Sequence, residues 1–204
     1  KAFSDRKLIF VPKGESGTWC STSECIWSSS TSIKGKVTLQ QDYEDLEIIF
    51  VDIIGVKRLT LQIIYDEMLG MGSETTVAEV KSAVRCLNSV LQSSTEQVDR
   101  EPLLRKNIFP IRLPDGSKIL ANAGADFSIG DRDYLIKQFS GLIKLLDFEM
   151  EEVQDLRPFL EWTQIYNRCL SVAVKERTFV GPGSTRPVDL SNRDLKRKAY
   201  AFLR

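Results

Sequence analysis

The sequence predicts an α+β fold, in which a small antiparallel sheet is covered by amphipathic helices. Two observations support this prediction. First, the stretch from Asn107 to Trp162 begins with two apolar segments around Pro114–Gly116. Proline presets the first position of a turn and glycine accepts a positive φ, so the two segments form a hairpin. Second, apolar residues recur at helical spacing over residues 43–92, which indicates a helical layer.

The first predicted element is a short apolar strand from Lys7 to Val11, which ends at Pro12. A loop rich in glycine and serine is expected from Lys13 to Thr18. Trp19 and Trp27 then flank a serine-rich stretch. They would suit a platform for binding a partner. Because tryptophan is highly buried on average, inward-facing anchors of an irregular loop are the favoured interpretation.

Three helices are predicted to pack as the helical layer. Apolar residues recur from Tyr43 to Ile53, and Gly55 is placed to end that helix. The second helix is expected from Leu59 to Leu69. The third begins with a capping box formed by Thr76 and Glu79, and it keeps one apolar face over four turns.

The central unit should contain strands at Ile108–Leu113 and Lys118–Ala121, with a further short strand at Asp126–Ile129. Helices are expected to follow, the first from Asp131, since carboxylates favour the start of a helix. Pro158 is expected to end the second of these helices, because the residue before a proline avoids helical angles.

The predicted organisation has three parts. Residues 1–92 contain the N-terminal strand, the loop and the three-helix layer. Residues 93–106 are polar and form a linker or a long loop. Residues 107–204 contain the hairpin, its helices and a basic C-terminal helix. One continuous domain is the alternative.

Composition excludes several chemistries. The chain of 204 residues has no histidine, which removes Ser-His-Asp and Cys-His nucleophile systems and histidine-based zinc sites. It has 28 basic and 28 acidic residues, so no global field attracts nucleic acid or anionic membrane. No apolar run approaches a membrane span of about 20 residues. The first residue is Lys1, and we expect an intracellular fragment, cytoplasmic or nuclear, of a longer chain.

The four cysteines do not form a CxxC pair. Reduced core cysteines are the default interpretation, and a four-thiolate zinc site or a disulfide between Cys20 and Cys25 are the alternatives.

Two groups of polar residues are candidate sites. Asp131 and Asp133 would suit a Mg²⁺-dependent enzyme, because hard cations prefer oxygen ligands, although both also suit a helix start. Arg132 would pair with either carboxylate or with a neighbouring domain. In the last helix, Lys196, Arg197 and Lys198 would suit nucleic-acid phosphates. Its apolar stripe favours a surface helix instead.

Nearly the whole chain is spanned, in order, by the phrases LIFVP, SECIWSS, FPIRLPDGS, DFSIGDRD, LDFEMEEVQDLRPFLEW and RDLKRKAYAFLR. With these phrases it resembles an interior segment of very large fungal proteins that are similar to sacsin and to the plant NO VEIN proteins. Such proteins carry a GHKL-type ATPase domain, of the kind found in heat-shock chaperones and histidine kinases, near their N-terminus. The Asp-x-Gly-x-Gly element and the glycine-rich lid of that domain are missing from this sequence.

The resemblance therefore implies a non-catalytic structural or interaction module of a chaperone-like, ATPase-bearing protein. Its partners would be neighbouring domains of the parent chain or other proteins. ATP and Mg²⁺ are implied only for the parent protein, and no cofactor, nucleic acid or membrane is expected for this segment. The alternatives are a nucleic-acid-binding module that uses the basic C-terminal helix and an enzyme that uses Asp131 and Asp133.

Overall fold

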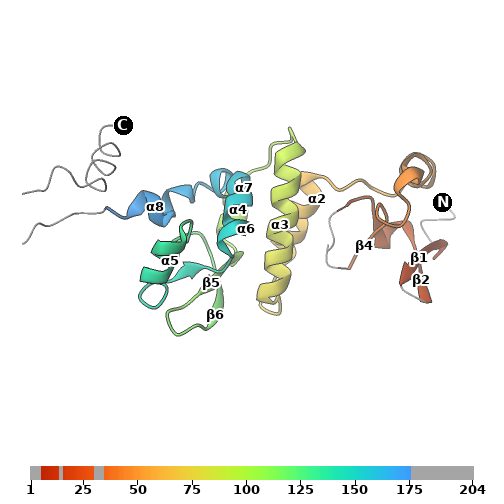
Figure 1. The fold of residues 1–204 in the computed structure, drawn as a ribbon. Helices are drawn as coiled ribbons and strands as arrows, with labels where there is room; N and C mark the ends of the chain where they lie inside the picture. Colours follow the sequence, from red (N-terminus) through yellow and green to blue (C-terminus); the bar gives the residue numbers. More distant parts are fainter. Residues whose placement is uncertain (1–5, 14–15, 30–34, 176–204) are drawn as a thin grey trace, which may run out of the picture. The chain divides into compact units, whose positions relative to one another are not determined.

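The α+β prediction is confirmed: a computed structural model combines helices with small antiparallel sheets (Figure 1). The structure describes residues 6–13, 16–29 and 35–175. The chain divides into two units, Lys1–Val174 and Lys175–Arg204, and all but one residue of the second lies outside the described part.

The chain begins with a β-hairpin where a strand and a loop were predicted. Strand β1 (Ile9–Lys13) pairs antiparallel with β2 (Ser16–Cys20). The expectation that Pro12 ends the strand was wrong, because a two-stranded sheet has only edge strands and an edge tolerates proline. The prediction of a loop from Lys13 to Thr18 was also wrong. The ring of Phe10 lies over Gly17 of β2, in the space that a β-carbon would occupy, which explains why this strand contains a glycine.

The segment predicted as the first helix adopts a different geometry. It forms a 3₁₀ turn, η2 (Glu44–Leu46), and then a π-helix, η3 (Ile48–Ile54). Gly55 ends the π-helix at a φ of +88°, which confirms its predicted role. Phe50 is the buried residue of η3, and it packs against Trp27 and not against the other two helices. The predicted three-helix layer is therefore a pair of helices.

Phe50 belongs to a small cluster that we call the N-terminal core. Two further elements lie beside it, the 3₁₀ turn η1 (Thr22–Glu24) and a parallel pair of short strands, β3 (Cys25–Ile26) and β4 (Val37–Thr38). The buried members of the N-terminal core are Ile9, Val11, Cys20, Cys25, Trp27, Leu39, Phe50 and Val56.

The helical pair consists of α2 (Leu61–Gly70) and α3 (Val77–Ser93), which lie side by side (Figure 1). The side chain of Thr60 caps α2, since it accepts a hydrogen bond from the amide of Ile63 at 3.3 Å. The predicted capping box of α3 is confirmed, because Thr76 and Glu79 each bond the backbone amide of the other.

Asn88 is a buried polar residue on the apolar face of α3. Its amide nitrogen donates to the carbonyl of Asp155 at 2.9 Å, and its side-chain oxygen accepts from the amide of Phe159 at 3.0 Å. These groups belong to the junction of two short helices, α6 (Met150–Asp155) and α7 (Arg157–Trp162). Asn88 thus satisfies backbone groups at the break between them and joins that break to α3.

Residues 93–106 contain the short helix α4 (Glu101–Leu104). Leu103 of α4 is fully buried, and the hydroxyl of Tyr65 donates to the carbonyl of Asp99 at 2.6 Å. The segment thus packs against the largest cluster of buried residues, which we call the main core. That core draws residues from both sides of the segment, from Ile26 to Cys169.

The main core is closed by a three-stranded antiparallel sheet in the order β6-β5-β7. The predicted hairpin joins β5 (Phe109–Arg112) to β6 (Lys118–Ala121), and Gly116 takes a φ of +84° in its turn. Strand β7 (Leu145–Leu146) was not predicted. The strand predicted at Asp126–Ile129 is reduced to single bridges, Ser128 with Leu145 and Ile129 with Cys169.

The remaining helices are short. Helix α5 (Asp133–Phe139) starts close to where it was expected. Pro158 does not end a helix but lies in the first turn of α7. Proline is tolerated there, because the backbone N–H groups of a first turn have no acceptor within the helix. The described chain ends with η4 (Tyr166–Arg168) and α8 (Leu170–Ala173). Leu170 packs with Leu135 and Leu145 in a third, small cluster.

Candidate functional site

The most prominent surface feature of the first unit is a row of isoleucines on η3. Ile48 is 69% exposed and Ile53 is 75% exposed, while Ile49 between them is 43% exposed. In a π-helix, hydrogen bonds join residues five apart, so Ile48 and Ile53 point in nearly the same direction. We call Ile48, Ile49 and Ile53 the outer apolar face. Phe50 holds the opposite side of the helix in the N-terminal core.

A second exposed apolar feature lies on the outward side of the N-terminal hairpin. Side chains alternate along a strand, so Ile9 and Val11 point into the N-terminal core and Phe10 points outward. The rings of Phe10 and Trp19 contact each other across the strands, with centroids 5.3 Å apart and planes at 60°. Trp19 is nevertheless 55% exposed.

The two tryptophans are therefore not equivalent. Trp27 is buried and stacks on Phe50 with centroids 5.9 Å apart, as the inward-facing interpretation requires. Trp19 lies at the surface, where it is available to a partner. Trp19 lies in the hairpin opposite Phe10, whereas Trp27 follows β3, outside the hairpin.

The two predicted carboxylates serve different elements. Asp131 accepts hydrogen bonds from the amide of Ser171, at 3.0 Å, and from the hydroxyl of the same residue. Asp133 lies in the first turn of α5 and pairs with Lys137 at 2.6 Å. Arg132, between them, lines a pocket of about 340 Å³ together with Asp131. Among the described residues, no group of three or more acidic or cysteine side chains is placed to hold a metal ion.

Sequence reasoning missed a buried carboxylate, Asp147, between β7 and α6. Its Oδ2 lies 2.9 Å from the ammonium of Lys81 on α3 and 3.0 Å from that of Lys118 on β6. Its backbone amide donates to the carbonyl of Pro110. Burial opposes the charge of Asp147, but the two lysines outweigh burial and hold the pKa of this carboxyl below its usual value. The carboxyl of Asp147 is therefore ionised, and its ion pairs join the segment before α6 to α3 and to β6.

The geometry around Asp147 is that of a structural ion pair. Both ammonium groups are at ion-pair distance from Oδ2, yet they lie outside the angles of a good hydrogen bond. The ammonium of Lys81 also lies 5.1 Å from the ring centre of Phe148, and Arg85 pairs with Glu152 next to it. The position of Asp147 inside the apolar run LLDF was the available signal, since a charge in such a run needs a partner.

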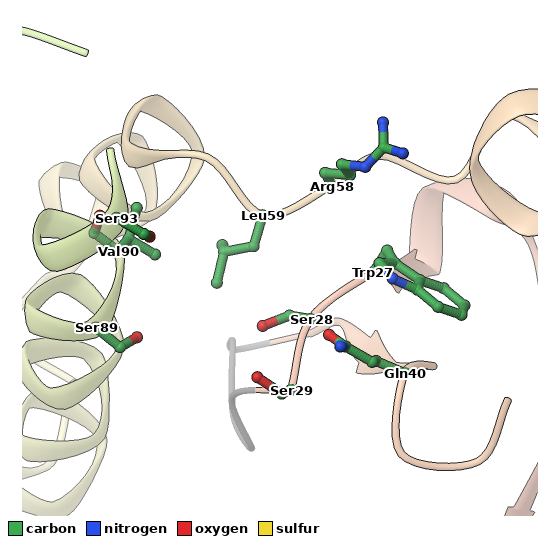
Figure 2. Close-up of a pocket in the computed structure, with 9 residues that line it drawn as sticks. All are labelled: Trp27, Ser28, Ser29, Gln40, Arg58, Leu59, Ser89, Val90 and Ser93. Atoms are coloured by element: carbon green, nitrogen blue, oxygen red, sulfur yellow. Dashed lines mark hydrogen bonds between the residues drawn. The ribbon is translucent and has the colours of Figure 1, made fainter. Parts of the chain in front are cut away.

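Figure 2 shows a pocket of about 300 Å³ between the segment after β3 and helix α3. Its lining is mostly uncharged. The side chain of Leu59 projects between the two walls, and the guanidinium of Arg58 points away from Ser28 and Ser29. Arg58 pairs instead with Glu47 at 2.9 Å. The lining contains no pair of acid and base. It consists of Trp27, Ser28, Ser29, Gln40, Arg58, Leu59, Ser89, Val90 and Ser93.

All four cysteines are buried, and they are not joined in disulfides. Burial raises the pKa of the Cys25 thiol to about 12 and that of Cys169 to about 11, so neither is a nucleophile at neutral pH. The basic residues Lys196, Arg197 and Lys198 lie outside the described residues.

The fold and these surfaces define an α+β domain that exposes apolar side chains at its N-terminal end. Residues 62–174 match a family described as a domain of unknown function (DUF8348). The match covers more than half of the chain, which therefore belongs to this family. No curated protein and no solved structure shows significant similarity to it. Within the described residues, the helices are too short or too polar to cross a membrane.

Proposed function

We propose that this chain is a non-catalytic structural and interaction module of a larger, sacsin-like protein that carries a GHKL-type ATPase domain. In this proposal the partner is a neighbouring domain of the same protein, and ATP with Mg²⁺ acts only in the ATPase domain. The module supplies a surface through which a change of conformation reaches the rest of the protein.

The observation that carries the proposal is the outer apolar face. If a partner buried Ile48 and Ile53, each side chain would contribute about 1.5–3 kcal/mol to the free energy of binding. Contiguous exposed apolar residues of this kind mark protein contacts. Because Phe50 fixes the helix in the N-terminal core, the face is presented on a firm support and would lose little freedom on binding.

The polar groups support a structural role as well. Asp131 is engaged by Ser171, and Asp133 is engaged by Lys137. Asp147, the most buried acid of the described chain, is balanced by two lysines. These carboxylates are used to hold elements together.

The test is a binding measurement between this chain and the ATPase-bearing part of the parent protein, by titration calorimetry. The double substitution Ile48→Ser and Ile53→Ser is expected to weaken binding by about 100-fold or more, since two apolar contacts are lost. The matched control is Leu142→Ser with Val172→Ser, which also removes two exposed aliphatic side chains. Equal affinity of the wild type and the Ile48/Ile53 variant would contradict the proposal.

A further inference from the structure

A second cavity of about 320 Å³ lies where the loop after α2 meets the end of α4. One wall comes from Gly72 and Ser73, and the other comes from Arg105, Lys106 and Asn107. Three apolar side chains complete the lining: Met71, Ile108 and Leu120. The cavity has the size of a small-molecule site and the mixed lining that such sites show.

The cations of this cavity are unneutralised. Arg105 and Lys106 are exposed, and no carboxylate lines the cavity. Across the part of the chain that the structure describes, neither side chain joins an ion pair, whereas other basic residues do, among them Lys7, Arg58, Lys81, Arg85, Lys118, Lys137 and Arg157. Two positive charges next to each other repel, so an anion between them would be stabilised.

The backbone on both sides of the cavity is held in place. Leu103 is fully buried just before Arg105, and Ile108 is fully buried just after Asn107. The amide of Ile108 donates to the carbonyl of Lys106 at 2.9 Å. On the opposite wall, the hydroxyl of Thr75 accepts from the amide of Gly72 at 3.2 Å. The backbone that carries the donors of the cavity is therefore held in place, which lowers the entropy lost on binding.

We propose that this cavity binds the phosphate group of a small molecule. The guanidinium of Arg105 is a planar fork that matches two phosphate oxygens, and the ammonium of Lys106 adds a point charge. The amide of Asn107 and the hydroxyl of Ser73 supply further donors. Leu120 and Met71 give the organic part of the ligand an apolar wall. This site does not depend on the proposed interaction role, because it lies on different elements from the outer apolar face.

The test is a titration of the chain with inorganic phosphate at constant ionic strength, followed by calorimetry. We expect saturable binding to the wild type. The variant Arg105→Gln with Lys106→Gln should bind at least about tenfold more weakly, because two charge-assisted hydrogen bonds are lost. The control Lys13→Gln with Lys144→Gln changes the net charge by the same amount at exposed positions elsewhere and should bind as the wild type does.

A melting curve without phosphate shows whether each variant is folded. Should the Arg105/Lys106 variant be unfolded, Asn107→Ala with Ser73→Ala removes two uncharged donors and is expected to weaken phosphate binding severalfold. Absence of saturable binding to the wild type would overturn the proposal. Equal weakening in the cavity variant and in the charge-matched control would overturn it too.

Discussion

Replacing Phe159 by alanine is expected to lower the free energy of unfolding by about 3–5 kcal/mol. Phe159 is completely buried at the start of α7, and its ring lies 5.9 Å from that of Phe109 on the central strand of the sheet. The substitution removes this contact and leaves a cavity that the surrounding main core fills only in part. Urea denaturation followed by circular dichroism measures the change.

The control for Phe159 is Tyr134→Ala in α5, an aromatic residue that is 56% exposed. Its removal should change the free energy of unfolding by less than about 0.5 kcal/mol. Phe159→Leu should recover most of the stability, because it restores much of the lost volume. If Phe159→Ala lowered the free energy of unfolding by less than about 1 kcal/mol, the burial of Phe159 in the main core would be contradicted.

Replacing Asp147 by alanine is expected to cost about 3 kcal/mol, at the low end of the range for breaking a buried ion pair. The loss leaves Lys81, whose side chain is 16% exposed, without its counter-charge. Lys118 is half exposed and can turn to water, which limits the cost. Asp133→Ala is the matched control, because its ion pair with Lys137 is exposed and contributes about 0–1 kcal/mol.

The contribution of Asp147 should also depend on pH. Its pKa is lower in the folded chain than in the unfolded chain, so its stabilising effect is complete above the unfolded pKa of about 3.9 and is lost as the pH falls through the folded value. The difference in unfolding free energy between the wild type and Asp147→Ala should be constant from about pH 5 to 8 and should shrink below about pH 4. A difference that grows on acidification would contradict an ionised Asp147.

Local signals predicted the parts of the fold that depend on neighbouring residues. The hairpin followed from Pro114 and Gly116, and the start of α3 followed from Thr76 and Glu79, since a turn or a cap is decided within four residues. The end of η3 at Gly55 followed in the same way.

Elements that depend on distant partners could not be predicted from those signals. Strand β7 has two residues and exists because Leu146 pairs with Ile111. The π-helix has the apolar spacing of an ordinary helix, so the spacing did not reveal its geometry. Pro158 lies near a helix boundary, but its position alone did not distinguish the end of one helix from the start of the next.

The candidate sites divide in the same way. The exposure of Trp19 depends on the register of the hairpin, and the role of Asp147 depends on two lysines that lie far from it in sequence. The apolar residues from Tyr43 to Ile53 predicted a helix packed in a layer, because apolar spacing does not reveal whether a neighbouring element covers a residue. Ile48 and Ile53 remain in water because the helix turns Phe50 inward.

In the proposed role, this chain provides a contact surface, and its chemistry is supplied elsewhere in a larger protein. The most direct measurement is ATP turnover by the purified chain in the presence of Mg²⁺, with Asp131→Ala/Asp133→Ala as the companion variant. We expect the chain to hydrolyse ATP no faster than a buffer blank, with the variant indistinguishable from it. Sustained ATP turnover that the double substitution abolishes would contradict the proposed non-catalytic role of this chain.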